Sequence, residues 1–127
     1  MTMQVELVSP ERILWSGEAD MVIARTTDGE IAFLSNHAAF IGALGIGAVT
    51  IEEPGGKQTK FAVHGGFVEV SNNRVTLLSD VAEVASDIDA ARARAAKEAA
   101  EAALRAGEDI EAEAALRRAN LRIDLAA

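Results

Sequence analysis

The stretch "DVAEVASDIDAARA" at residues 80–93 separates two parts of the chain that have different residue patterns. Before it, short β-branched runs alternate with turn signals, which is typical of a β-sandwich or barrel. After it, residues 88–127 contain no proline and one glycine, and alanine dominates, which is helix composition. The pattern predicts a β-sandwich domain over residues 1–84 and a helical domain over residues 85–127.

Two turn signals indicate hairpins inside the β domain. The segments "GAVTIEE" and "KFAVHGG" flank a turn that carries Pro54, Gly55 and Gly56. A second pair, "FVEV" and "RVTLL", is separated by a turn with Asn72 and Asn73, residues that tolerate the left-handed conformation of tight turns. The two signals predict consecutive antiparallel strands in this part of the chain.

The helical domain has a candidate start and a candidate break. Ser86 followed by Asp89 has the form of a capping box, which predicts a first helix from about residue 87. Gly107 interrupts the pattern, and residues 110–123 resume it, so two antiparallel helices are expected. An alanine face contributes only about 0.5–1 kcal/mol per contact, against roughly 1.5–3 kcal/mol for a buried leucine. The hairpin is therefore either a detachable element or a permanently docked one.

Composition narrows the possible functions. The net charge of −8 argues against nucleic-acid binding, and the absence of cysteine excludes disulfides and thiolate sites. The sequence shows no signal peptide and no apolar run long enough for a membrane span, so we predict a soluble cytosolic protein without direct membrane insertion. His37 and His64 lack partners at metal-ligand spacing, and no catalytic residues or metal site are expected. We interpret His64 as a satisfied residue of the sandwich.

Several strings occur in an order that resembles the epsilon subunits of bacterial rotary (F-type) ATP synthases. They are "VELVSPERILWSGEAD" at 5–20, "TTDGEIAFLSNHAAFIGALGIGAV" at 26–49, "FAVHGGFVEV" at 61–70 and "NRVTLLSDVAEVASDID" at 73–89. The resemblance implies a ten-stranded β-sandwich followed by an antiparallel helical hairpin. It also implies a non-catalytic rotor subunit of the proton-translocating complex, peripheral on the cytoplasmic face of the cell membrane, with sodium coupling left open.

The same resemblance implies partners. The sandwich is expected to contact the gamma subunit and the ring of c subunits, and the extended hairpin is expected to reach the alpha/beta catalytic head and inhibit ATP hydrolysis. Glu30 and His37 match family positions at the ring and gamma contact, although Ser35 and Asn36 replace the family's proline and glycine. The alternative for these two residues is a solvated loop charge and a loop-capping imidazole.

The resemblance further implies ATP as a regulatory ligand, with no required cofactor. The segment "IDAARA" at 88–93 matches the family's nucleotide motif at Asp89 and Arg92, "ALRRANLRI" supplies Arg118 and Arg122, and Glu83 matches an acidic position near the nucleotide. Alternatively, Asp89 only completes the helix cap and Arg92 pairs with it. Arg118 and Arg122 then meet Glu83 or contact acidic patches on the catalytic head. A different class of function also stays open, a free-standing ATP-sensing or small-ligand-binding β-sandwich with a helical lid.

Overall fold

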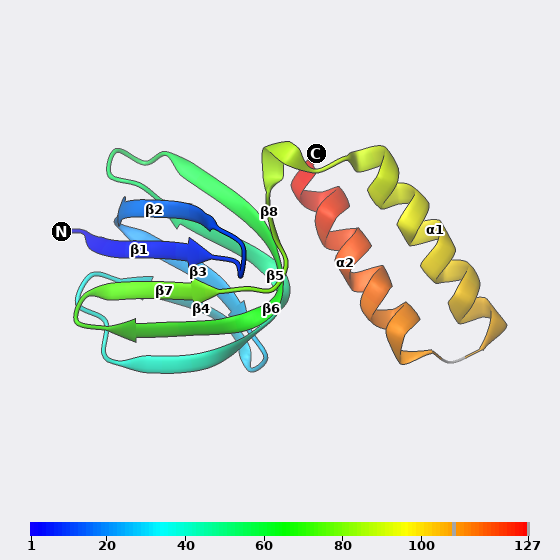
Figure 1. The fold of residues 1–127 in the computed structure, drawn as a ribbon, viewed down its shortest axis with the longest axis horizontal. Coiled ribbons are helices and arrows are strands. Elements are labelled where there is room, and N and C mark those ends of the chain that lie inside the picture. Colours follow the sequence, from blue (N-terminus) through cyan, green and yellow to red (C-terminus); the bar gives the residue numbers. More distant parts are fainter. Residues whose placement is uncertain (108, 127) are drawn as a thin grey trace.

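The computed structural model describes residues 1–107 and 109–126, so Glu108 and Ala127 of the predicted helical domain lie outside the described residues. The chain forms strands first and helices last (Figure 1). The strands are β1 (Met3–Val8), β2 (Ile13–Ala19), β3 (Met21–Thr26), β4 (Gly29–Leu34), β5 (Phe40–Glu52), β6 (Gln58–Ser71), β7 (Arg74–Leu78) and β8 (Ala82–Val84). A 3₁₀ turn η1 (Ala85–Asp87), helix α1 (Ala90–Ala106) and helix α2 (Ile110–Ala126) follow.

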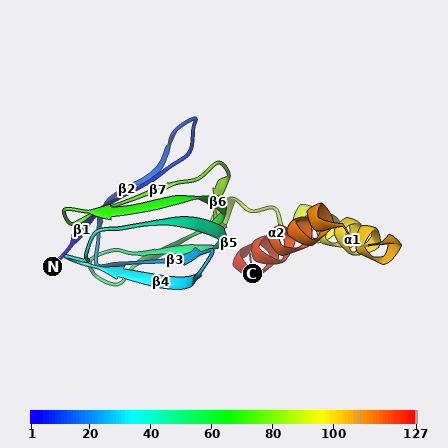
Figure 2. The ribbon, with the colours of Figure 1, turned by 90° about the horizontal axis from the view of Figure 1, so that it is seen from below.

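The strands form one sheet in the order β2-β1-β7-β6-β5-β3-β4, and β8 pairs with β6. β6 pairs with β7 through residues 67–71 and with β8 through residues 61–63, so its two halves belong to different layers. β5 follows β6 along both halves, and together they turn the sheet back on itself as a sandwich (Figure 2). This fold confirms the predicted sandwich and hairpin.

The predicted count of ten strands is wrong for the described residues, in which eight strands are seen. The reason is that β5 and β6 are 13 and 14 residues long and pass through the bend without ending. Gly66 has φ of +124°, a backbone conformation that side chains with a Cβ rarely adopt, so it lets β6 turn there. Each long strand therefore serves both layers.

The core lies between the two layers. Val5 and Leu7 from β1 are fully buried, as are Val22 from β3 and Leu77 from β7, in keeping with the alternation of apolar residues along these strands. Phe33 is the largest fully buried side chain. The sandwich therefore has its own hydrophobic core, independent of the helices.

The helical hairpin packs around small residues. The buried residues of α1 are Ala93 and Ala100, and those of α2 are Ala112 and Ala119. α2 contacts β5 and β6, whereas α1 lies on the outer side of α2, away from the sandwich (Figures 1 and 2). The larger apolar residues of the hairpin are only partly buried or exposed. In this structure the hairpin is folded against the sandwich through a single helix.

The first helix does not begin as predicted. Ser86 lies in η1, and the residue at the N-cap of α1 is Asp89, whose Oδ1 accepts from the backbone N–H of Arg92 at 3.1 Å. The predicted capping box and the start near residue 87 are therefore wrong. The cause is local, because η1 ends at Asp87 and Ile88 is extended, which moves the helix start to Ala90.

Candidate functional site

A cavity of about 480 Å³ lies where the chain leaves the sandwich and enters the hairpin. Its polar lining combines residues of β8, the segment before α1, and both helices. The lining residues are Val81, Glu83, Asp87, Ile88, Asp89, Arg92, Ala93, Ala96 and Arg122. Four of the five residues predicted to bind ATP therefore line one cavity, and the fifth, Arg118, lies elsewhere.

Glu83 and Arg122 form the strongest contact in this cavity. Arg122 Nε donates to Glu83 Oε1 at 2.6 Å, joining α2 to β8. Burial raises the pKa of the Glu83 carboxyl, but the hydrogen bond and positive charge of Arg122, with a smaller contribution from His64, outweigh it and leave the pKa below its usual value. The carboxylate is therefore ionised near neutral pH and ties the hairpin to the sandwich.

Asp89 and Arg92 stand on the rim of the same cavity. Both are exposed, and the Asp89 carboxylate is engaged by the backbone N–H of Arg92 as the helix cap. In the described part of the chain no ion pair is recorded for the Arg92 guanidinium. The predicted cap role of Asp89 is confirmed, and Arg92 is a lining residue of the cavity.

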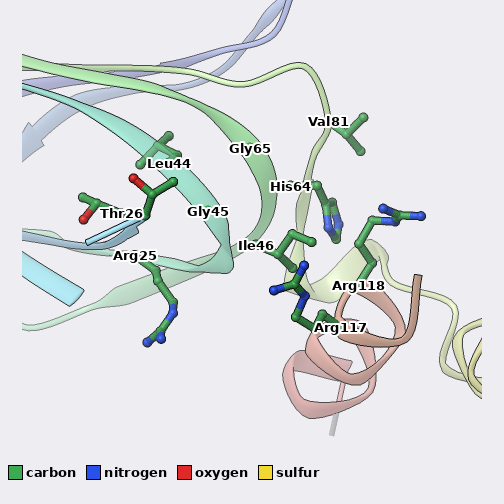
Figure 3. A pocket seen from close by; sticks show the side chains of 11 residues that line it. Arg25, Thr26, Leu44, Gly45, Ile46, His64, Gly65, Val81, Arg117 and Arg118 are labelled. Atoms are coloured by element: carbon green, nitrogen blue, oxygen red, sulfur yellow. The ribbon is translucent and has the colours of Figure 1, made fainter. Parts of the chain in front are cut away.

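Arg118 lines a second, larger cavity of about 650 Å³ on the other side of α2, at the bend of β5 and β6. Its Nη2 atom donates to Glu111 Oε1 at 2.7 Å, within the same helix. The predicted pairing with Glu83 is made by Arg122 and not by Arg118. Figure 3 shows Arg118 beside His64 and Arg117 in this second cavity.

Sequence reasoning missed His64, which lines the second cavity and contacts Glu83 of the first. Its side chain is only 3% exposed, and Nε2 lies 3.4 Å from Glu83 Oε1, the oxygen that also accepts from Arg122. Its Nδ1 atom is buried without a hydrogen-bond partner, so the interpretation of His64 as a satisfied sandwich residue is wrong. Burial and the nearby positive charge of Arg122 lower the pKa of the ring, although Glu83 opposes them. The only sequence signal was its position, after the apolar segment "FAV" and directly before Gly65 and Gly66.

Glu30 and His37 do not meet. Glu30 stands near the start of β4, opposite Arg25 in register, whereas His37 follows the end of the same strand. His37 Nδ1 lies 2.7 Å from the Ala38 carbonyl oxygen, and its ring packs edge-on against Phe33 at 5.1 Å. Glu30 is exposed. The structure thus places the two residues at opposite ends of β4.

The remaining chemistry is limited. Within residues 1–107 and 109–126, no group of three His, Asp or Glu side chains is placed to hold a metal ion. No helix of the described part is long and apolar enough to cross a membrane. The chemically distinctive region is therefore the junction between the sandwich and α2, with its one carboxylate bridge and its arginines.

Comparison with known proteins gives a consistent family signal. Residues 2–85 match the family model described as the ATP synthase delta/epsilon chain, beta-sandwich domain. The ATP synthase epsilon chain of Brevibacillus brevis is 48% identical over 78% of this chain and 75% of its own length. That of Desulforamulus reducens is 43% identical over 98% and 97%.

Solved structures share the fold. A chain in the mitochondrial ATP synthase OSCP/F1/c-ring of Euglena gracilis superposes with a TM-score of 0.86 at 23% identity, covering 94% of this chain and 78% of that one. A chain in the central stalk/c-ring of the Tetrahymena thermophila mitochondrial ATP synthase gives a TM-score of 0.56 at 19% identity, covering 69% and 70%. Both superpositions cover more than half of this chain and show that the fold is similar.

Proposed function

The chain belongs to the ATP synthase delta/epsilon family, and from that membership we propose that it is a rotor subunit whose helical hairpin is a movable brake on ATP hydrolysis. The family assigns it to the ATP synthase complex as a non-catalytic subunit. The assemblies named for the two structural neighbours, an F1/c-ring and a central stalk/c-ring, support a place beside the gamma subunit and the c-ring. The sandwich couples ring rotation to gamma in this proposal.

An exposed apolar face supports a protein partner for the sandwich. Phe67 of β6 and Leu78 of β7 stand opposite each other in register and are 60% and 48% exposed. Ile41 of β5 projects from the same face, because it stands opposite Glu69 and two residues before Ala43, the partner of Phe67. Exposed apolar residues grouped in this way mark interaction surfaces. We assign this face to the gamma subunit.

The movable hairpin is supported by how little holds it. α1 makes its packing contacts with α2, and α2 rests on the bend of β5 and β6. The α1–α2 seam buries alanines, which contribute little apolar area. The observation that carries the proposal is the Arg122–Glu83 ion pair. In the described residues it is the one side-chain hydrogen bond that joins the hairpin to the sandwich. Breaking it frees α2 to extend toward the alpha/beta head.

ATP is the proposed regulatory ligand of the folded hairpin. The cavity beside α1 offers the guanidinium groups of Arg92 and Arg122, and guanidinium groups suit phosphate oxygens. Arg118, the other predicted arginine, stands in the second cavity, so in this arrangement Arg92 and Arg122 supply the positive charge. A nucleotide that binds only the folded state stabilises it by about 1.4 kcal/mol at ten times its Kd. Rising ATP would then hold the hairpin down.

The proposed location follows from the complex. The subunit is peripheral, on the cytoplasmic face of a bacterial cell membrane, and is held there by its partners in a proton-translocating ATP synthase. Glu30 belongs to the proposed contact with the polar loops of the c-ring, and its exposure at the start of β4 supports this. His37, at the other end of β4, is proposed to contact gamma.

The brake is tested in the assembled complex. Replacing the subunit by a form that lacks residues 86–127 should leave assembly intact, because the sandwich has its own core, while ATP hydrolysis rises several-fold. The full-length subunit, reconstituted in parallel, is the control. Unchanged hydrolysis in a fully assembled complex would show that the hairpin does not inhibit.

ATP binding is tested with the full chain alone. Millimolar ATP should raise the Tm of the wild-type chain, and Arg92→Ala or Arg122→Ala should remove the rise. Arg94→Ala is the matched control, since Arg94 is an exposed arginine of the same helix that does not line the cavity. A Tm that ATP leaves unchanged, or a rise that survives both cavity substitutions, contradicts the proposal.

A further inference from the structure

The second cavity, of about 650 Å³, has a strongly basic lining on an acidic protein. It opens between the end of β3, the bend of β5 and β6, and α2. Its lining residues are Arg25, Thr26, Thr27, Leu44, Gly45, Ile46, His64, Gly65, Val81, Arg117 and Arg118. The list contains three arginines and a histidine but no carboxylate. Because the chain as a whole carries a net charge of −8, this concentration of positive groups favours an anionic ligand.

Two arginines of α2 lie beside one buried ring (Figure 3). Figure 3 shows the His64 ring between the side chains of Arg117 and Arg118, whereas Arg25 points away from them on the outer rim. Arg118 is held by Glu111, but that carboxylate is 78% exposed, so the pair is weak and solvent-screened. In the described residues no ion pair is recorded for Arg117. Two arginine side chains thus flank the buried ring, one on either side in the view of Figure 3.

His64 supplies the second, independent observation. Its Nδ1 atom is buried without a partner, although buried polar atoms are nearly always hydrogen-bonded. The Nε2 atom faces Glu83 Oε1, and a carboxylate only accepts, so the proton of the neutral ring belongs on Nε2. In that tautomer Nδ1 is an unpaired acceptor. A ligand that reaches it must therefore offer a donor or bring a proton to the ring.

We propose that this cavity is an anion site, separate from the Glu83–Asp89–Arg92 cavity, that binds a small organic phosphate through Arg117, Arg118 and Nδ1 of His64. A phosphate monoester satisfies both requirements, because its oxygens accept from guanidinium groups and its singly protonated form has an O–H that donates to Nδ1. Leu44, Ile46 and Val81 provide an apolar wall for the organic part. The volume lies within the range typical of small-molecule sites.

Binding at this cavity is coupled to protonation of His64. The charged groups that face the ring are Glu83 from β8 and Arg122, Arg118 and Arg117 from α2, with Arg25 of β3 on the rim. The arginines disfavour the imidazolium ion, and a phosphate between them reduces that repulsion. The ring then takes one proton from solvent onto Nδ1, which becomes a donor to a phosphate oxygen. Phosphate affinity should therefore rise as the pH falls.

The test follows the ring ¹⁵N signals of His64 by NMR in the full chain, with phenyl phosphate, orthophosphate and sulfate as probes. Phenyl phosphate should shift these signals saturably and raise the pH midpoint of the ring. Sulfate, which has no O–H at neutral pH, should bind more weakly than phosphate at pH 7.5. Loss of a charge-assisted contact in Arg117→Ala should weaken phenyl phosphate by about tenfold or more.

Arg94→Ala is the matched control, because Arg94 is an exposed arginine that lines neither cavity and its loss should leave the phenyl phosphate shift at His64 unchanged. Arg117 is exposed, so Arg117→Ala should fold, and Arg117→Gln provides a second variant. The absence of a saturable shift at His64 would overturn the proposal. Wild-type affinity in both Arg117 variants would also overturn it, as would equal loss in Arg92→Ala, which would place the phosphate in the other cavity.

Discussion

Arg122 Nε donates to Glu83 Oε1 at 2.6 Å and thereby connects the second helix to the last strand across 39 residues of sequence. The same carboxylate oxygen lies 3.4 Å from Nε2 of His64, in β6. Three separate elements therefore meet at one oxygen atom. Because α2 is the helix that contacts the sandwich, the loss of this ion pair is expected to loosen the hairpin.

Arg122→Ala should loosen the hairpin without unfolding the sandwich. The pair is partly buried, since the side chains of Arg122 and Glu83 are 26% and 32% exposed. We therefore expect the substitution to cost about 1–2 kcal/mol of docking free energy, more than the loss of a surface ion pair and less than the loss of a buried one. Amide hydrogen exchange in residues 110–126 should accelerate about 5- to 30-fold, while exchange in β1 and β7 stays unchanged. Arg94→Ala is the control on α1. Equal acceleration in both variants would show that the ion pair does not hold the hairpin.

The free energy of unfolding should decrease as the pH falls, over two separate pH ranges. The folded-state pKa of His64 is lowered, chiefly by burial and then by Arg122, so the unfolded chain binds a proton at higher pH than the folded chain does. Stability is therefore lost as the pH falls from about 6.5 through the lower folded pKa. The Glu83 pKa is also lowered, so its contribution is lost only as the pH falls below about 4.5.

Urea unfolding at pH 7.5 and 5.5 measures the loss of stability in the first pH range, which is set by His64. The wild-type chain should lose more stability between these pH values than His64→Gln, which cannot be protonated at this site. Parallel losses in the two proteins would mean that the His64 environment does not set the pH dependence. As the pH falls from 4.5 through the lowered folded-state pKa, the difference in stability between wild type and Glu83→Gln should shrink, because the wild-type carboxyl then becomes protonated and loses its charge.

The parts of this structure that were predictable depend on local pattern. Asn72 and Asn73 both have positive φ in the β6–β7 turn, as their type suggested, and Gly107 follows directly on the end of α1. The alanine-rich segments form the two helices. Each of these features is determined by residues that are neighbours in sequence, so composition and turn chemistry were enough.

The features that were missed depend on distant segments. The strand count failed because β5 and β6 continue through the bend, which only the pairing of β6 with β7, β8 and β5 reveals. His64 was missed because its partner Glu83 is 19 residues away on another strand, and Arg122 comes from the last helix. Ser86 and Asp89 both fitted a cap, and the choice between them rests on the η1 turn.

Ala100→Leu should separate the two helices. Ala100 is buried in the α1–α2 seam, and a leucine there would overpack it at a cost of about 1–3 kcal/mol. Leucine is nearly as good a helix former as alanine, so the loss would come from packing and not from helix propensity. Thermal unfolding followed by circular dichroism at 222 nm should show an earlier helical transition. Ala99→Leu, at the exposed neighbouring position, should melt like wild type; equal melting of both variants would argue against a tight seam.

Gly66→Ala should disrupt the bend on which α2 rests. Gly66 has φ of +124°, and a Cβ there would overlap the Leu78 carbonyl oxygen and lie 2.8 Å from Ser79 Cα. Both neighbours are backbone atoms, so relief requires β6 and the end of β7 to move apart. Gly45, on β5 at the same bend, has no such restriction, since its nearest neighbour would be the Thr26 carbonyl oxygen at 3.7 Å. Urea unfolding should therefore show that Gly66→Ala lowers the free energy of unfolding by about 3 kcal/mol or more. Gly45→Ala should lower it by less than about 1 kcal/mol. Equal stability of the two variants would mean that the bend adapts, and that the long strands are not fixed at Gly66.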